Sequence, residues 1–341
     1  MKLRVRAPTR ITLAGSTLDI YPLYLFEGGG LTLNAAIDLC TEVELETRSD
    51  QRICIEATDL DLVLEGPDLE ALHSNGEFAP LDLILRILRF YRPRQGLSVR
   101  THSSVPPGSG LGGSSSLLIC LSTALVQLEN RPVNKQQMID CGANIEAQSL
   151  RVPTGKQDYF PAAYGGFNAL WFEIQGIRRE PLTFSAKLKN QLQDQMLLGY
   201  SGVSRFSGSS NWSIMRRYIE NEGPTVLRLG KIKEIALAMY QSLKEEDLDK
   251  FADCLAADWE NQKGLAEGVT TPQIERIFKA AQRAGALASK ICGAGGGGCF
   301  FTWVGEGSRQ AVKKAIEENG GEILDYRFSE SGVQVVEEEP L

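Results

Sequence analysis

A glycine-rich segment of the chain has the composition of a phosphate-binding loop. Residues 106–116 read PPGSGLGGSSS, with two prolines, four glycines and three closing serines. Glycine lets backbone N–H groups approach phosphate oxygens closely, and serine hydroxyls can reach a phosphate or a Mg²⁺ ion. The same residues could instead form a loop that ends in a serine helix cap. We call this segment the glycine loop.

Two widespread phosphate-loop patterns describe the glycine loop poorly. The Walker pattern requires a lysine after the last glycine, where this chain has Ser114. The dinucleotide pattern GxGxxG is formally met by Gly108, Gly110 and Gly113, but two prolines separate it from the preceding strand. An NAD-binding oxidoreductase therefore stays a remote alternative.

Two acidic residues beyond the glycine loop could serve phosphoryl transfer, which needs charge neutralisation and an oriented acceptor hydroxyl. Glu146 falls in the last turns of an expected helix, where the helix dipole disfavours an anion and a cation would balance it. Asp158 lies in the segment after that helix. Glu146 could also be a solvated surface residue, and Asp158 an Asx-turn residue.

The elements that must position these residues follow from the hydrophobic pattern. In the first half, strands are expected within residues 3–13, 37–46, 54–57, 60–64 and 97–101, and helices over 81–91, 117–128 and 134–150. Asn134 and Gln137 predict a capping box at the last helix, and residues 151–166 are expected to be a loop.

The second half is richer in helical periodicity. Helices are expected over 226–243, 248–261, 272–284 and 309–318, with strands over 298–304, 323–328 and 333–336. This order favours an α+β fold in two layers. The change from mostly strand to mostly helical periodicity near residues 167–190 predicts two lobes, residues 1–167 and 168–341.

The overall composition excludes several classes of protein. The net charge of −7 argues against a nucleic-acid surface, and two histidines argue against a histidine-rich metal site or a Ser/His/Asp triad. Seven cysteines without a CxxC pair indicate free thiols in a reducing compartment. We find no signal peptide or membrane-spanning run and expect a cytoplasmic protein that binds neither nucleic acid nor membrane.

Three segments together resemble the motifs of the GHMP kinases, the superfamily of galactokinase, homoserine kinase, mevalonate kinase and phosphomevalonate kinase. The segments are APTRITLAG at 7–15, the glycine loop, and KICGAGGGG at 290–298, which we call the third motif. They stand in the family's order and span almost the whole chain. The resemblance implies an N-terminal ribosomal-protein-S5-domain-2-like lobe, a C-terminal ferredoxin-like α/β sandwich, and an active site between them.

The resemblance also implies ATP and Mg²⁺ as cofactors and a role for each motif. Asp158 would be the catalytic carboxylate, with Arg10 beside it, and Ser114 and Glu146 would bind Mg²⁺. The nucleotide would be bound by Pro107, Gly108, Ser109, Gly110, Leu111, Gly112, Gly113, Ser114, Ser115 and Ser116. The third motif is expected to join a helix to the strand that begins near Cys299.

Residues 28–38, 155–158 with 165–168, and 200–205 most resemble the heptose 7-phosphate kinase and fucokinase branch, which phosphorylates the anomeric (C1) hydroxyl. The implied substrate-binding residues are Asp19, Thr17, Gln157, Gly202, Arg205, Gly295 and Gly296. Leu18 departs from the heptose-kinase pattern, which has a small polar residue there. The identity of the sugar therefore stays open among fucose, galactose, a uronic acid and a different heptose. A mevalonate-type alcohol and a catalytically silent sugar sensor are separate alternatives, and the presence of Arg10, Glu146 and Asp158 together argues against the silent sensor. The protein is expected to be a monomer or a homodimer.

Overall fold

The computed structural model describes residues 1–204 and 207–339. Its larger sheet has eight strands. It is built around β2 (Gly30–Thr47). At 18 residues, this strand is long enough to pair with several other strands. One half of β2 pairs with β5 (Leu97–Ser103) and the other with β6 (Phe167–Glu173), while β1 (Lys2–Ala14) runs antiparallel along it.

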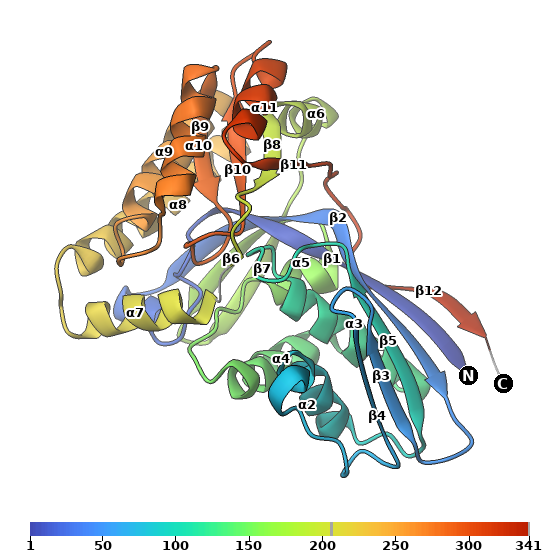
Figure 1. Ribbon diagram of the computed structural model, residues 1–341. Coiled ribbons are helices and arrows are strands. Elements are labelled where there is room, and N and C mark those ends of the chain that lie inside the picture. The colour runs from blue at the N-terminus through green and yellow to red at the C-terminus, as the bar shows by residue number, and fades with distance from the viewer. Residues whose placement is uncertain (205–206, 340–341) are drawn as a thin grey trace.

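The remaining strands extend this sheet on its edges. β3 (Ile53–Ala57) runs parallel to β5 and pairs with β4 (Leu62–Gly66), and β7 (Gly176–Leu182) pairs with β6. β12 (Gln334–Glu339) pairs with β1, so strands from the two ends of the described chain lie side by side (Figure 1).

Helices cover this sheet on the side of the glycine loop. They are α2 (Asp82–Tyr91), α3 (Gly113–Leu128), α4 (Lys135–Leu150) and the short α5 (Tyr159–Tyr164), preceded by the 3-10 helix η1 (Gly76–Leu81). The four-residue α1 (Leu23–Phe26) lies beside β6. Apolar side chains on nearly all faces of α3 bury it against β1, β2, α2 and α4, which fixes the position of its first turn.

The second lobe contains a four-stranded antiparallel sheet in the order β11-β8-β10-β9. The strands are β8 (Met196–Tyr200), β9 (Ala286–Ile291), β10 (Cys299–Val304) and β11 (Glu322–Leu324). The helices of this lobe are α6 (Ala186–Gln195), α7 (Ser207–Ile219), α8 (Thr225–Glu245), α9 (Leu248–Gln262), α10 (Pro272–Arg283) and α11 (Arg309–Glu318) (Figure 1). One buried cluster joins Ile11 and Leu33 of the first sheet to Phe301 and Trp303 of the second, so the lobes share a core.

The α+β fold predicted from the sequence is confirmed. The expected helices at 81–91, 134–150, 248–261 and 309–318 lie within one or two residues of α2, α4, α9 and α11. The side chain of Asn134 caps α4 by accepting a hydrogen bond from the Gln137 amide at 3.0 Å.

Two local predictions were wrong. Residues 151–166 are not loop throughout, because the buried segment Tyr159–Tyr164 forms α5. The third motif joins strand β9, not a helix, to β10, because the apolar positions of ALASKI alternate at strand period and pair with β10. The lobe division at 167/168 stays a prediction; strand pairing by itself assigns β6, β7 and β12 to the first sheet.

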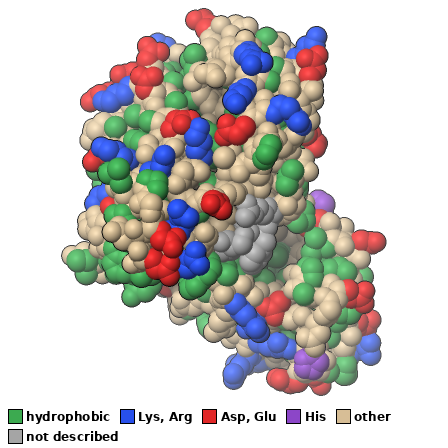
Figure 2. Space-filling view, turned by 60° about the vertical axis from the view of Figure 1, so that its left-hand side comes forward, with side chains coloured by type: hydrophobic (Ala, Val, Ile, Leu, Met, Phe, Trp, Pro, Cys, Tyr) green, Lys and Arg blue, Asp and Glu red, His purple; other side chains and the backbone are tan. Residues whose placement is uncertain are grey.

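The surface and the helices agree with the composition of the chain. Figure 2 shows acidic and basic side chains interspersed on the face turned to the viewer, which agrees with the similar numbers of the two kinds, 43 Asp and Glu against 36 Lys and Arg. None of the helices in the described ranges combines the length and apolarity that crossing a bilayer requires. All seven cysteines are free, as predicted.

Candidate active site

A cavity of about 580 Å³ opens where the glycine loop, the end of β1 and the third motif meet. Its wall includes residues 106–110 and 112–115 of the glycine loop, and Gly293 and Ala294 of the third motif. One end is polar and holds Arg10, Thr17, Asp19, Gln157 and Asp158; the other is largely apolar and is lined by Ala57, Leu60, Pro80, Leu81 and Ile84. The cavity therefore offers separate places for a charged group and a flat apolar one.

The backbone of the glycine loop forms the surface that an anion would meet. Gly108, Gly110 and Gly112 have φ angles of +70°, +74° and +78°, a left-handed conformation that side chains with a Cβ rarely adopt. Gly112 is the N-cap of α3, and among the described residues no side chain caps this end. The first-turn amides and the positive end of the helix dipole thus face the cavity.

The residues predicted to bind the nucleotide divide into two groups. The cavity is lined by Pro107, Gly108, Ser109, Gly110, Gly112, Gly113, Ser114 and Ser115. Leu111 is fully buried in the core, and the Ser116 hydroxyl donates a 2.9 Å hydrogen bond to the Ala7 carbonyl, so these two side chains point away from the cavity.

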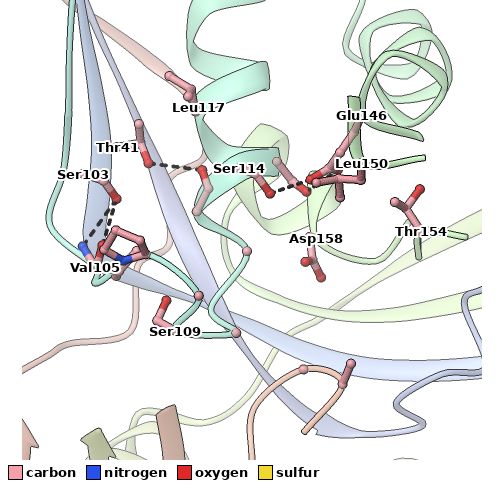
Figure 3. Close-up of a pocket in the computed structure, with 18 of the residues that line it drawn as sticks. Thr41, Ser103, Val105, Ser109, Ser114, Leu117, Glu146, Leu150, Thr154 and Asp158 are labelled. Atoms are coloured by element: carbon pink, nitrogen blue, oxygen red, sulfur yellow. Dashed lines mark hydrogen bonds between the residues drawn. The ribbon is translucent and has the colours of Figure 1, made fainter. Parts of the chain in front are cut away.

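Glu146 meets the two serines of the α3 terminus. Ser114 Oγ donates to Glu146 Oε1 at 2.5 Å (Figure 3). Ser115 Oγ donates to Glu146 Oε2 at 3.1 Å. The Tyr159 hydroxyl also donates to Oε2. Burial raises the pKa of Glu146, and the hydrogen bonds from these three hydroxyls oppose the rise. A buried carboxylate among hydroxyl groups suits a hard divalent cation.

The described residues contain no cluster of three or more His, Cys, Asp or Glu that could hold a metal ion. A Mg²⁺ ion bound here would therefore depend on Ser114, Glu146 and oxygens of a bound phosphate. Mg²⁺ commonly binds in this way, with one or two carboxylates and substrate phosphates completing its shell. The residues present fit that arrangement.

Arg10 and Asp158 form a bidentate ion pair beside the glycine loop. Nε and Nη2 of Arg10 donate to Oδ1 and Oδ2 of Asp158 at 2.7 and 2.8 Å, and Nη1 donates to the Gly110 carbonyl at 2.5 Å. Burial by itself lowers the pKa of Arg10, but the charge and hydrogen bonds of Asp158 outweigh burial and raise it. The Asp158 side chain keeps 23% exposure, so it remains accessible from the cavity.

Asp19 and Gln157 define the polar end of the cavity. Asp19 Oδ2 accepts a hydrogen bond from the Gln157 amide at 3.1 Å, and Gln157 Oε1 accepts one from Thr12 at 2.8 Å. Burial and the negative charge of Asp158 raise the pKa of Asp19 to about 6. Thr17, with a φ of +77°, lines the cavity between Asp19 and the end of β1.

Comparison with known proteins places this geometry in a family. The family models for the GHMP kinases N terminal domain and the GHMP kinases C terminal match residues 82–166 and 239–322, which contain the glycine loop and the third motif. The chain belongs to the GHMP kinases.

Two relatives and one solved structure are similar along their full length. A D-glycero-alpha-D-manno-heptose 7-phosphate kinase of Campylobacter jejuni is 29% identical, covering 97% of this chain and 98% of the relative. A mevalonate kinase of Pyrococcus abyssi is 27% identical, covering 97% of each. The crystal structure of a D-glycero-D-manno-heptose 1-phosphate kinase from Bacteroides thetaiotaomicron has a TM-score of 0.79 and 27% identity, with all of both chains covered.

Within this GHMP kinase, some predicted substrate residues lie away from the cavity. Gly202, Gly295 and Gly296 are not among the described residues that line it, and the third motif contributes Gly293 and Ala294 instead. The Gly296 amide donates to the Val269 carbonyl at 2.7 Å, which turns this part of the motif toward its own lobe. Arg205 lies outside the described residues.

Sequence reasoning missed three residues that orient the GHMP kinase site. Tyr159 donates to Glu146, Thr12 donates to the Gln157 side chain, and Asn34 donates to the Gln157 carbonyl at 3.2 Å. Asn34 is a polar residue inside an otherwise buried strand, and this was a signal that could have drawn attention to it.

Proposed function

We propose that this ATP-dependent sugar kinase transfers the γ-phosphate of Mg-ATP to the anomeric hydroxyl of a heptose phosphate or a closely related sugar. The observation that carries the reaction class is the Arg10–Asp158 pair, which lies against the glycine loop and opens into the same cavity as Asp19. The full-length similarity to heptose phosphate kinases supports the sugar assignment.

The nucleotide would span the cavity from its apolar to its polar end. Ala57, Leu60, Leu81 and Ile84 provide the apolar walls that suit an adenine base. The amides of the glycine loop and the first turn of α3 would then receive the phosphates. Ser114 and Glu146 would hold Mg²⁺, which supplies positive charge to the phosphate oxygens when it is bound.

The acceptor would lie at the polar end, where Thr17 and Asp19 can bond its hydroxyl groups. Its anomeric oxygen attacks the γ-phosphorus, and the bond from that phosphorus to the β–γ bridging oxygen breaks to leave ADP. Asp158 accepts the proton that the acceptor hydroxyl loses. Arg10 keeps both carboxylate oxygens in place by its two parallel hydrogen bonds and adds positive charge beside the transferred group.

A mevalonate-type alcohol is the second candidate acceptor, because mevalonate kinases are also similar over nearly the whole chain. The carboxylate of Asp19 and the hydroxyl of Thr17 at the polar end favour a polyhydroxylated acceptor instead.

ATP consumption over a panel of acceptors, with phosphorus NMR of each product, tests the proposal. The panel contains D-glycero-α-D-manno-heptose 7-phosphate, galactose, fucose, glucuronate and mevalonate. We expect turnover with the heptose phosphate and a new signal from an anomeric phosphate. Phosphate on any other oxygen, or preference for mevalonate, would overturn the assignment of the acceptor.

A further inference from the structure

A buried polar cluster lies behind the cavity, and of its members only Ser16 also lines that cavity. Lys290 of β9 and Asp258 of α9 form an ion pair in which Nζ lies 2.5 Å from Oδ2 and both side chains have zero exposure. Nζ also donates to Gln262 Oε1 at 2.5 Å and to Ser16 Oγ at 3.0 Å. The three protons of the ammonium group therefore have three acceptors.

This cluster connects the two lobes at the polar end of the site. The second oxygen of Asp258 accepts a hydrogen bond from the Gly15 amide at 3.3 Å, and the Gln262 amide group donates to the Gly293 carbonyl at 2.7 Å. Gly15 begins residues 15–20, which we call the acceptor loop, and Gly293 begins the glycine-rich part of the third motif. The cluster thus holds one loop from each lobe.

The acceptor loop depends on such support. Gly15 and Thr17 have φ angles of +78° and +77°, and the second of these is a left-handed conformation at a β-branched residue. A backbone in so sparsely populated a region persists only where its surroundings hold it. The loop carries Thr17 and Asp19, so a shift of its backbone would move the side chains that face the acceptor.

Stability alone explains the ion pair poorly. Replacing a fully buried ion pair by apolar residues of similar volume is often neutral or stabilising, because desolvation offsets the attraction between the charges. A fixed arrangement of charges can instead specify one geometry. In this protein that geometry relates the acceptor loop to the third motif.

We propose that Lys290 and Asp258 are positioning residues that set the affinity for the acceptor by holding the acceptor loop against the third motif. The inference rests on the proposed function, because it takes the polar end of the cavity as the place of the acceptor. It assigns the pair no contact with substrate and no part in proton transfer.

The test compares wild type with Lys290→Met and with Lys290→Met/Asp258→Asn. The double variant removes both charges and so avoids an unpaired buried carboxylate. Thr225→Val is the matched control, because it removes a buried hydrogen bond to the Leu265 carbonyl in the same lobe without touching the acceptor loop. Each protein is measured for melting temperature, ATP affinity by calorimetry, steady-state kinetics with heptose 7-phosphate, and amide hydrogen exchange.

For the double variant we expect kcat/KM for heptose 7-phosphate to fall by about 10- to 100-fold, the cost of a small misplacement in an active site. ATP affinity should stay near that of wild type, and amides of residues 15–20 should exchange faster while those of the glycine loop do not. Thr225→Val should lower the melting temperature without changing the KM for heptose 7-phosphate.

Either of two results would overturn the positioning role. One is a double variant with wild-type kcat/KM and unchanged exchange at residues 15–20; the other is a loss that Thr225→Val reproduces at equal melting temperature. If wild type itself leaves heptose 7-phosphate unphosphorylated, the proposed acceptor fails. The exchange measurement, which needs no acceptor, then decides the positioning role by itself.

Discussion

Arg10 and Asp158 are 148 positions apart in the chain and meet edge to edge, with both carboxylate oxygens bonded by one guanidinium. The same guanidinium holds the carbonyl of Gly110. A lysine could not replace this planar fork, because its ammonium group is a point charge without fixed directions. The pair therefore couples the position of the carboxylate to the position of the glycine loop.

Asp158→Asn tests the proton acceptor. Asparagine keeps the size of the side chain but is not basic, and positioned acid–base groups contribute about 100- to 10,000-fold to rates. We expect kcat to fall by that factor while ATP affinity measured by calorimetry stays near wild type. Asp140→Asn, on the exposed side of α4, is the control and should keep full activity. Full turnover in Asp158→Asn would assign the proton to another group.

Ser114→Ala and Glu146→Gln test the metal ligands. Each removes one oxygen ligand or its charge, so the Mg²⁺ concentration for half-maximal activity should rise by at least about 10-fold. Titration of activity with Mg²⁺ at fixed ATP measures the change. Ser116→Ala is the matched control, since its hydroxyl bonds the Ala7 carbonyl away from the cavity. Equal Mg²⁺ dependence in all three variants would remove the first two residues from the metal site.

Asp19 should give the reaction an acid limb. Burial and the charge of Asp158 raise the pKa of Asp19 to about 6, so the carboxylate takes up a proton as pH falls through 6 and loses its capacity as an anionic acceptor. We expect kcat/KM for the sugar to fall below that pH, with ATP affinity much less affected. Asp19→Asn should be slower and should lack this limb. A limb unchanged in the variant would show that another group titrates.

The carboxylate of Asp19 should lower the free energy of unfolding at neutral pH. The pKa of Asp19 is 3.8 ordinarily and about 6 when folded, so the folded state binds the proton more tightly. The resulting contribution to the free energy of unfolding is complete below pH 3.8 and is lost as pH rises through 6, by up to about 3 kcal/mol. Urea denaturation should therefore show Asp19→Asn more stable than wild type at pH 7 and nearly equal at pH 4. The same difference at both values would contradict this.

Gly110→Val should abolish nucleotide binding. A Cβ at this position would lie 2.6 Å from the Cys292 carbonyl oxygen, and valine disfavours the φ of +74°. Gly76→Val is the matched control, because Gly76 also has a positive φ but a Cβ there meets nothing within 4 Å. Calorimetry with ATP compares the two. Normal ATP affinity in folded Gly110→Val would exclude close contact between this part of the loop and the phosphates.

The parts of the site that could be predicted from the sequence depend on residues close together in the chain. A glycine loop before a helix, and acids at a set distance from it, can be read from neighbouring residues, and the structure brings Arg10, Asp19, Glu146 and Asp158 to one cavity. The local sequence pattern could not show that the side chains of Leu111 and Ser116 turn inward, because their orientation depends on how the glycine loop and α3 pack against the rest of the lobe.

The remaining features depend on contacts between distant segments. The hydrogen bond from Lys290 to Ser16 joins residues 274 positions apart, and no periodic pattern in the sequence indicates it. The apolar end of the cavity collects residues from β3, η1 and α2, each of which resembles ordinary core in isolation. The pairing of β6 and β7 with the first sheet was not predicted for the same reason. The hydrophobic pattern of the sequence changes near these strands, although the sheet continues through them.

The pairing of β12 with β1 sets an order on folding. Lys2 is registered opposite Glu339, so β1 is synthesised more than 300 residues before the strand that covers its edge. Until β12 has been synthesised, the edge of β1 exposes unpaired backbone N–H and C=O groups, which can pair with strands of other chains. β12 therefore protects the edge of β1, and synthesis interrupted before β12 would release a lobe prone to aggregate.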